Sequence, residues 1–298
     1  MTAEPRSDAT SELDAMLEDS RQQFDALYDG ADARAPEKPT PAPGPAPEPA
    51  APATAAPAPS SQPAPDPDYD GPMVNLSVRD ALRDAMAEEM RRDESVILIG
   101  EDVGKSGGIF KCSEGLWEEF GGDRVVDAPI SEAGYVGLSV GAAMTGMRPI
   151  AELMFGDFVL LTMDQLVNQA AKIRYMTGGQ CRVSLTVRLS MGAGRSSAAQ
   201  HSQSLHALFA HIPGLKVVIP SCPSDAKGLL KSAIRDDDPV IFIEHKLLSM
   251  NEGPEPEEEY VIEFGIGDIK RTGNDVTLIA CGSMVPKSLA VADSLARE

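Results

Sequence analysis

The sequence lacks the short motifs that mark several common enzyme classes. No glycine-rich dinucleotide fingerprint follows a predicted strand, and no phosphate-binding loop of the GxxxxGK[ST] type occurs. The four cysteines, Cys112, Cys181, Cys222 and Cys281, have no CxxC spacing, and the four histidines have no metal-site spacing. The sequence therefore argues against a zinc knuckle, a dithiol redox centre and the usual nucleotide sites.

Basic residues are scarce. Lys and Arg number 26 against 46 Asp and Glu, which gives a formal net charge of −20, and no basic stripe occurs. Half of this charge falls on residues 1–72, which hold 14 acidic and 4 basic residues. Because proteins bind nucleic acids largely through basic contacts to phosphates, this composition argues against a nucleic-acid partner.

Long apolar segments are also missing. No apolar run reaches the length needed to span a membrane, and the acidic N-terminus resembles neither a secretory signal nor a transit peptide. Cysteines without paired spacing in a large domain are typical of a reducing compartment. The sequence therefore predicts a cytoplasmic protein with no membrane partner.

The N-terminal part has a composition of its own. Residues 36–72 are rich in Pro and Ala, cannot bury a core, and predict an extended linker. Before the linker, residues 1–35 are expected to be a tail with a short amphipathic helix at 11–28, where apolar residues repeat at helical spacing. That helix is either a docking element for a partner or a marginal helix that frays alone.

Residues 73–250 alternate between short apolar runs and helical patterns. Ser77 and Asp80 resemble a capping box at the start of the first helix. Strands are predicted at 96–100, 124–127, 149–154, 183–189, 216–220 and 239–245, and further helices at 131–147, 160–176, 203–211 and 224–235. This alternation predicts one α/β domain with a mainly parallel sheet and helices on both faces.

The helix predicted at 131–147 is unusually rich in Gly and Ala. Small residues let another backbone approach closely, so the composition favours a close contact between helices. Such a contact occurs either within one domain or between subunits, and the sequence leaves both alternatives open.

After this domain the pattern changes. Residues 251–274 predict a connector that contains an acidic loop at 251–260 and a short hairpin at 261–273. A strand at 275–283 and a helix at 285–297 then begin a new unit, which cannot bury its own apolar faces without further structure. The sequence therefore predicts the start of an incomplete C-terminal α/β domain at 275–298.

Several distinctive strings follow one another along the chain. They include LIGEDVGKSGGIF (98–110), DAPISEAGYVGLSVGAAMTGMRPIAELMFGDF (127–158), AAQHSQS (198–204) and HIPGLKVVIPS (211–221). Together they resemble the β subunits of thiamine-diphosphate-dependent 2-oxoacid dehydrogenases and of the related acetoin dehydrogenases. The resemblance runs from Val74 to the end of the sequence and does not cover residues 1–72.

The resemblance implies a transketolase-like pyrimidine-binding domain, followed by the start of a transketolase-type C-terminal domain. It implies thiamine diphosphate as the cofactor, shared with an α subunit that holds magnesium through a GDG motif absent from this sequence. It further implies a heterotetramer with the α subunit and acyl transfer to a lipoyl acyltransferase. Pyruvate is the first expected substrate and acetoin the close alternative, while a non-catalytic assembly module is the alternative of a different class.

The resemblance also assigns four site residues. Glu132 in PISEAG matches the glutamate that contacts the cofactor pyrimidine, although on its own it would be an ordinary first-turn acid at a helix start. Phe158 in MFGDF matches the aromatic residue that stacks on the pyrimidine, and His201 in AAQHSQS matches an active-site histidine that orients substrate and moves a proton. Glu101, at the carboxyl end of the first predicted strand of the domain, matches a residue of an acidic passage between paired active sites.

A last match concerns a monovalent cation. The positions that match the cation site of some family members are Leu185, Ala233, Ile234, Asp236 and Asp238. The ligands there are mostly backbone carbonyls, which suit a hard cation such as potassium. The segment SAIRDDDPV is equally typical of a helix end followed by a turn, so both interpretations stand.

Deleting residues 1–35 tests whether the predicted helix is a docking element. We expect decarboxylation with an artificial electron acceptor to be unchanged, because this arm contributes no candidate site residue. We expect weaker co-purification with the lipoyl acyltransferase and slower coupled turnover, since an apolar helix face would lose its groove on the partner. Unchanged binding and an unchanged coupled rate would show that the arm is only a solubility tail.

Overall fold

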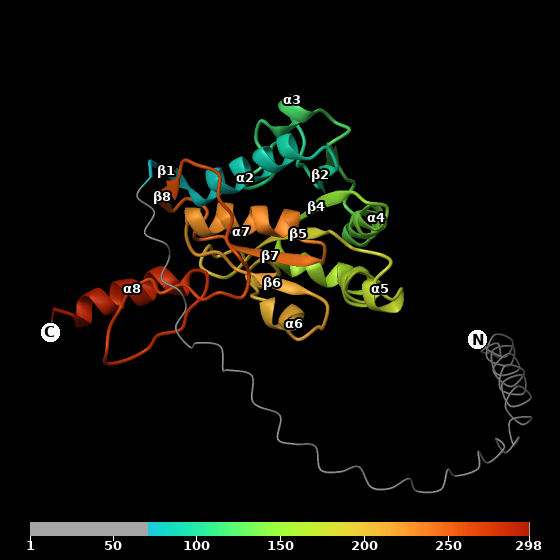
Figure 1. Ribbon diagram of the computed structural model, residues 1–298. Helices are drawn as coiled ribbons and strands as arrows, with labels where there is room; N and C mark the ends of the chain where they lie inside the picture. The colour runs from blue at the N-terminus through green and yellow to red at the C-terminus, as the bar shows by residue number, and fades with distance from the viewer. Residues whose placement is uncertain (1–70, 298) are drawn as a thin grey trace, which may run out of the picture. The chain divides into compact units, whose positions relative to one another are not determined.

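The computed structural model describes residues 71–297, so the predicted helix at 11–28 and nearly all of the predicted linker lie outside the described residues. The described part contains a six-stranded sheet and a separate two-stranded sheet. All pairings within the six-stranded sheet are parallel (Figure 1). This confirms the predicted α/β fold with a mainly parallel sheet.

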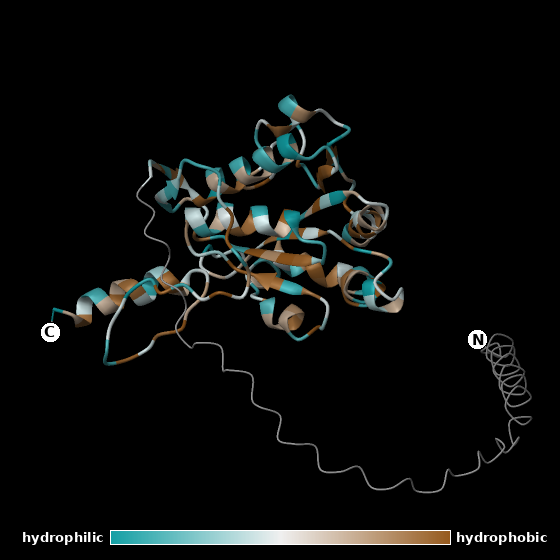
Figure 2. Cartoon of the chain, in the orientation of Figure 1, coloured by the Kyte–Doolittle hydropathy of each residue, from teal (hydrophilic) through white to brown (hydrophobic). Residues whose placement is uncertain are grey.

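The central sheet is buried on both of its faces. In spatial order its strands are β3 Val125–Asp127, β2 Val96–Gly100, β4 Arg148–Leu153, β5 Thr186–Met191, β7 Val240–His245 and β6 Lys216–Val218. Every residue of β5 is buried, and β7 is apolar along most of its length (Figure 2). Such continuous apolar strands are typical of parallel sheets that carry helices on both sides.

Two layers of helices cover the sheet (Figure 1). One core cluster packs α2 Val78–Arg92 and α7 Pro223–Arg235 against one face. The other face is covered by α4 Glu132–Met144, the 3₁₀ segment η1 Gly156–Thr162, the π-helical segment η2 Asp164–Ala170, α5 Ala171–Met176 and α6 His206–Ala210. The predicted arrangement of helices on both faces is therefore confirmed.

The capping box predicted at the start of α2 is present. Ser77 Oγ accepts the backbone N–H of Asp80 at 3.1 Å, and the same hydroxyl donates to the Asp80 carboxylate at 2.6 Å. A cap of this kind contributes about 1 kcal/mol by satisfying an N–H that the helix leaves unpaired. It fixes where α2 begins and therefore which residues of α2 face the sheet.

The acidic loop predicted at 251–260 contains a strand instead. The strand β8 Glu252–Pro256 pairs antiparallel with β1 Met73–Ser77 in the two-stranded sheet. Glu255 on β8 is fully buried, and its carboxylate accepts a hydrogen bond from Lys227 of α7 at 3.0 Å. The acidic composition led to the prediction of a loop. A strand forms because a buried lysine on another element balances the buried negative charge.

Two predicted strand segments near the C-terminus are wrong. Neither the hairpin at 261–273 nor the strand at 275–283 forms in the described part of the chain, although the predicted last helix is present as α8 Met284–Leu295. Residues 271–279 are exposed, and a strand needs a neighbouring strand to satisfy its backbone groups. Apolar alternation alone therefore does not produce a strand here.

Other predicted elements also differ in their bounds. The helix predicted at 160–176 is divided among η1, η2 and α5, and the strand predicted at 183–189 begins only at Thr186. The short helix α3 Leu116–Phe120 was not predicted. None of the described helices is long and apolar enough to cross a membrane.

Candidate functional site

The four candidate site residues lie beyond the carboxyl ends of the strands. Glu101 follows β2 directly, Phe158 lies in η1 after β4, and His201 follows β5. Glu132 begins α4, the helix that follows β3. Because all these strands are parallel, their carboxyl ends share one edge of the sheet, which is where α/β folds bind ligands.

Two buried carboxylates form the acidic part of the site. Glu101 and Glu132 are 8% and 7% exposed, and Glu101 Oε1 has no hydrogen-bond partner within the described residues. Burial raises the pKa of Glu101, and the negative charges of Glu132 and Asp102 raise it further. The charge of one carboxylate therefore acts on the other, and Glu101 is more readily protonated than an exposed glutamate.

Tyr135 lies one turn after Glu132 and joins this acidic group to β4. Its hydroxyl donates to the backbone carbonyl of Glu152 at 3.2 Å. Burial raises the pKa of the Tyr135 phenol, as do the nearby charges of Glu101, Glu132 and Glu152. Tyr135 therefore stays protonated and acts as a hydrogen-bond donor at this edge of the sheet.

A buried ion triad crosses the three central strands beneath the site. Arg188 on β5 donates to Glu152 of β4 at 2.9 Å and to Glu244 of β7 at 2.6 Å. Burial raises the pKa of Glu244 to about 7, while Arg188 lowers it and Glu152 raises it. The Arg188 pKa is raised by the two carboxylates against the effect of burial, so the arginine stays charged and holds both acids.

Phe158 and His201 are brought together by a second aromatic ring. The His201 ring lies 4.5 Å from the Phe155 ring and 5.3 Å from the Phe158 ring between centroids, both edge to face. Phe155 and Phe158 are themselves 5.8 Å apart. The structure therefore places the predicted stacking residue and the predicted histidine in one aromatic cluster, and it adds Phe155 to it.

These residues fit the pyrimidine half of thiamine diphosphate. An aminopyrimidine offers ring and amino nitrogens that bond to a carboxylate, and Glu101 keeps an unpartnered, buried carboxylate oxygen at this edge. A half-buried Phe158 supplies an aromatic ring for stacking. The segment η1, which carries Phe158, packs against α4, which carries Glu132, so the two predicted contacts belong to one region.

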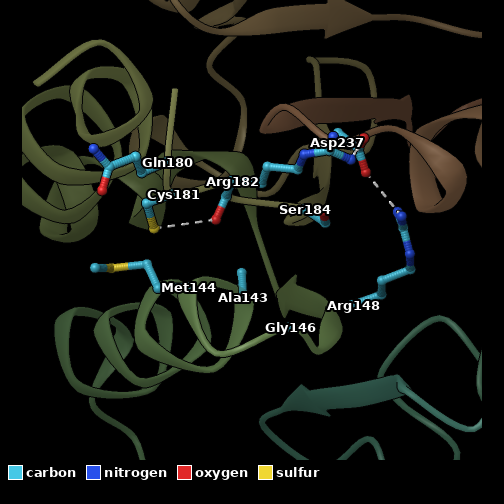
Figure 3. Close-up of a pocket in the computed structure, with 9 residues that line it drawn as sticks. All are labelled: Ala143, Met144, Gly146, Arg148, Gln180, Cys181, Arg182, Ser184 and Asp237. Atoms are coloured by element: carbon cyan, nitrogen blue, oxygen red, sulfur yellow. Dashed lines mark hydrogen bonds and ion pairs between the residues drawn. The ribbon is translucent and has the colours of Figure 1, made fainter. Parts of the chain in front are cut away.

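The five positions predicted for potassium lie at the opposite edge of the sheet. Leu185 precedes β5, and residues 233–238 end α7 and lead into β7. A cavity of roughly 350 Å³ lies there between the end of α4 and the segment before β5 (Figure 3). Arg148 and Asp237 point toward each other across its rim, with Nη2 at 2.9 Å from Oδ1.

The oxygens of the predicted potassium site already have partners. Arg148 Nη1 donates to the carbonyls of Ile234 at 3.1 Å and Asp236 at 2.9 Å. The Leu185 and Ala233 carbonyls accept backbone N–H groups, and Lys216 pairs with the carboxylates of Asp236 and Asp238. This arrangement does not fit a cation held by these oxygens, since basic side chains or backbone N–H groups already contact them, and potassium binding stays a prediction.

The sequence interpretation missed the charged residues that support the site. The missed residues are Glu152, Asp157, Arg188, Glu244 and Lys246, each at most 7% exposed. Most of them interrupt or directly follow an apolar run that was assigned to a buried strand. A charge in such a run is rare unless it is paired, so this signal could have identified the triad.

Ser139 lies in a sequence motif typical of nucleophilic serines, but its place in the fold does not suit that role. Residues 137–141 read GLSVG, the spelling of a nucleophile elbow, but such an elbow needs a strand-to-helix turn. Ser139 lies inside α4, is 1% exposed and donates to the Tyr135 carbonyl at 2.8 Å. The structure therefore does not present this serine as a nucleophile.

Comparisons with known proteins identify the domain. The profile of the transketolase pyrimidine-binding domain matches residues 74–251. The β subunit of acetoin:2,6-dichlorophenolindophenol oxidoreductase from Bacillus subtilis is 53% identical over 232 residues, which cover 74% of this chain and 68% of that protein. From the same organism, the 2-oxoisovalerate dehydrogenase β subunit is 47% identical, covering 75% of this chain and 68% of that protein.

Two further comparisons extend this result. The β subunit of the pyruvate dehydrogenase E1 component from Bacillus subtilis is 47% identical, covering 76% of this chain and 70% of that protein. Among solved structures, a split-gene transketolase described as an inactive β4 tetramer aligns with a TM-score of 0.61 at 22% identity. That alignment covers 74% of this chain and 68% of the transketolase chain, and it supports the fold alone.

Replacing Glu132 by Gln tests its assignment to the cofactor. We expect Glu132→Gln to fold normally, because the amide has nearly the same shape. We expect turnover dependent on thiamine diphosphate to slow on the order of 100-fold or more, as for the loss of a catalytic proton-transfer contact. Turnover would be measured in the assembled enzyme at saturating cofactor, and a wild-type rate there would remove Glu132 from the site.

Proposed function

The chain belongs to the family of transketolase-like pyrimidine-binding β subunits of thiamine-diphosphate-dependent dehydrogenases, and from this we propose that it works as half of a decarboxylating enzyme. In this proposal it is the β subunit of the decarboxylating component of a 2-oxoacid dehydrogenase complex. The observation that carries the proposal is the buried pair Glu101 and Glu132 at the carboxyl edge of the sheet. No structural role in the described residues explains why Glu101 keeps an unpartnered buried oxygen.

The proposed chemistry assigns each residue a task. When bound, thiamine diphosphate supplies the electron sink for decarboxylation. Glu132 would accept a hydrogen bond from the pyrimidine ring nitrogen and so favour the protonation state that the reaction needs. Phe158 would stack on the pyrimidine face, and Glu101 would accept a proton more readily than an exposed glutamate because burial raises its pKa.

His201 would serve the substrate side of the site. Its ring is half-buried against Phe155 and Phe158, and the segment before it is mostly exposed. An imidazole in this position can donate or accept a proton at the substrate oxygen during acyl transfer. We propose the lipoyl group of an acyltransferase as the acyl acceptor.

The face of α4 that points away from the sheet supports an α-subunit partner. Ile130, just before the helix, is 86% exposed and Leu138 is 63% exposed. Leu138 also borders an apolar cavity of roughly 280 Å³ at the start of the helix. A side chain at Gly141 would meet nothing within 4 Å in this chain, so nothing in the described residues requires glycine there. A partner backbone that packs closely on α4 would require it.

Pyruvate is the proposed substrate, with acetoin as the second candidate. The similarity to the acetoin-oxidising β subunit, at 53% identity, favours acetoin as the alternative. The pyruvate and 2-oxoisovalerate dehydrogenase β subunits are each 47% identical, so identity does not separate these substrates. We propose a cytoplasmic location, which the absence of disulfides among the four free cysteines of the described chain supports.

Co-expression with an α subunit that carries the GDG motif tests the proposed function. We expect decarboxylation of pyruvate with an artificial electron acceptor only when both subunits, thiamine diphosphate and magnesium are present. Acetoin and 2-oxoisovalerate would be assayed in parallel. If kcat/KM for either one is at least 10-fold higher than for pyruvate, that compound would replace pyruvate as the proposed substrate. An assembled, cofactor-loaded complex that consumes none of the three would refute the proposal.

Replacing Gly141 by Leu tests the proposed subunit contact. We expect the isolated chain to keep or raise its Tm, because Gly is about 1 kcal/mol less favourable than other residues inside an exposed helix. Co-purification with the α subunit should be lost, since the leucine would fill the space of the approaching backbone. Gly267→Leu, another open and exposed glycine, is the matched control and should leave association unchanged. Normal association of Gly141→Leu would place the contact elsewhere.

A further inference from the structure

Lys246 is a buried lysine next to the candidate site, and the proposed chemistry gives it no task. It follows β7 directly and is 2% exposed. Its ammonium group donates to the backbone carbonyl of His201 and lies 5.2 Å from the centre of the Phe155 ring. The same Phe155 ring packs edge to face against the His201 imidazole.

The other buried lysines of this domain differ in their partners. Lys227 on α7 pairs with two carboxylates, each at 3.0 Å. Lys231 on the same helix also pairs with two carboxylates, at 2.7 and 3.1 Å. Lys246 has no carboxylate within ion-pair distance among the described residues, and its hydrogen bond goes to a carbonyl. Burial lowers the pKa of Lys246, while the Asp157 carboxylate acts in the opposite direction. A lysine that served only stability would have a closer counter-ion, because burying a charge is costly.

The turn that carries His201 is held at its backbone from two more directions. Asp157 Oδ1 accepts the Gln203 backbone N–H at 3.2 Å and the Gln203 side-chain amide at 2.9 Å. The Gln203 carbonyl in turn accepts the Gly192 N–H at 3.0 Å. Together with Lys246, these contacts fix the backbone at position 201 and two residues later.

The segment before this turn is built differently. Residues 193–196 are exposed, and Ser196 and Ala198 have φ angles of 55° and 61°. Non-glycine residues adopt this left-handed conformation at an energetic cost, so the contacts that follow must hold it in place. The fixed part of the loop therefore begins at His201, the residue whose side chain faces the aromatic cluster.

We propose that Lys246, supported by Asp157, is a positioning residue that fixes the His201 turn so that the imidazole faces the substrate. In this proposal Lys246 acts through His201, because its buried ammonium group donates to the His201 carbonyl and lies against the Phe155 ring. Its contribution to catalysis rests on the proposed function of His201. We call the contacts of Lys246 and Asp157 with the His201 turn the clamp. The clamp is a property of the chain and can be tested without an activity assay.

The first test measures the clamp by limited trypsin digestion of the full chain, with mass spectrometry reading cleavage after Arg195. Arg195 lies in the exposed segment and becomes a better substrate when the loop is released. We expect Lys246→Met to increase cleavage at this bond about 10-fold. Lys227→Met, which removes a buried lysine of α7, should leave the rate of cleavage after Arg195 at the wild-type value even if the Tm falls. An unchanged rate for Lys246→Met, or an equal rise for Lys227→Met, would overturn the clamp.

The second test is a double-mutant cycle in the enzyme assembled with its α subunit. We expect Lys246→Met to lower kcat/KM at least 10-fold in the wild-type background. In a His201→Asn background the same change should alter kcat/KM less than about twofold, because Lys246 acts through His201. If the loss in kcat/KM of the double variant equals the product of the two single-variant losses, the positioning role is overturned. If the wild-type complex has no thiamine-diphosphate-dependent activity, the proposed function fails, and the digestion still decides whether Lys246 holds the turn.

Discussion

A single buried arginine holds the charged centre of this domain together. Arg188 lies in the middle of the parallel sheet, and its register places Glu152 of the neighbouring strand opposite it. Glu244 completes the triad from the strand on the other side. Removing one partner of such a buried group costs about 3–5 kcal/mol, because the remaining charge has neither water nor a counter-ion. The triad therefore makes any other register of the three central strands costly, and this register fixes where the loops of the site begin.

The two carboxylates above the triad have no such cation. Glu101 and Glu132 are also buried, yet no arginine or lysine pairs with either among the described residues. Burial raises the pKa of both Glu101 and Glu244, but only Glu244 has a cation, Arg188, that opposes this effect. The fold thus gives one pair of glutamates a shared cation and leaves the other pair open to a ligand. An unpaired buried acid is a cost that a purely structural domain would avoid.

Much of this arrangement follows from local sequence, and the remainder depends on contacts that local sequence does not encode. Apolar runs and a capping box predicted the central strands and α2, and the family strings predicted the acids and aromatic residue at the carboxyl edge. The strand β8 was missed, because its acidic side chains are balanced by Lys227 on a distant helix. The support of His201 by Lys246 joins residues 45 positions apart, so no pattern reveals it. The predicted potassium site rested on backbone carbonyls, whose identity in the sequence cannot show that Arg148 donates to two of them.

The helix α4 connects the site to the surface on which a partner would dock. Glu132 begins this helix, and Gly141 lies nine residues further along it, about 13 Å away at 1.5 Å per residue. The inner face of the helix packs on the sheet through residues such as Val136 and Val140, so the helix cannot shift without disturbing the core. A partner that covers the exposed face would therefore also exclude water from the end of the helix where Glu132 lies. Since exclusion of water strengthens every charge interaction in the site, assembly and chemistry would depend on the same rigid element under the proposed function.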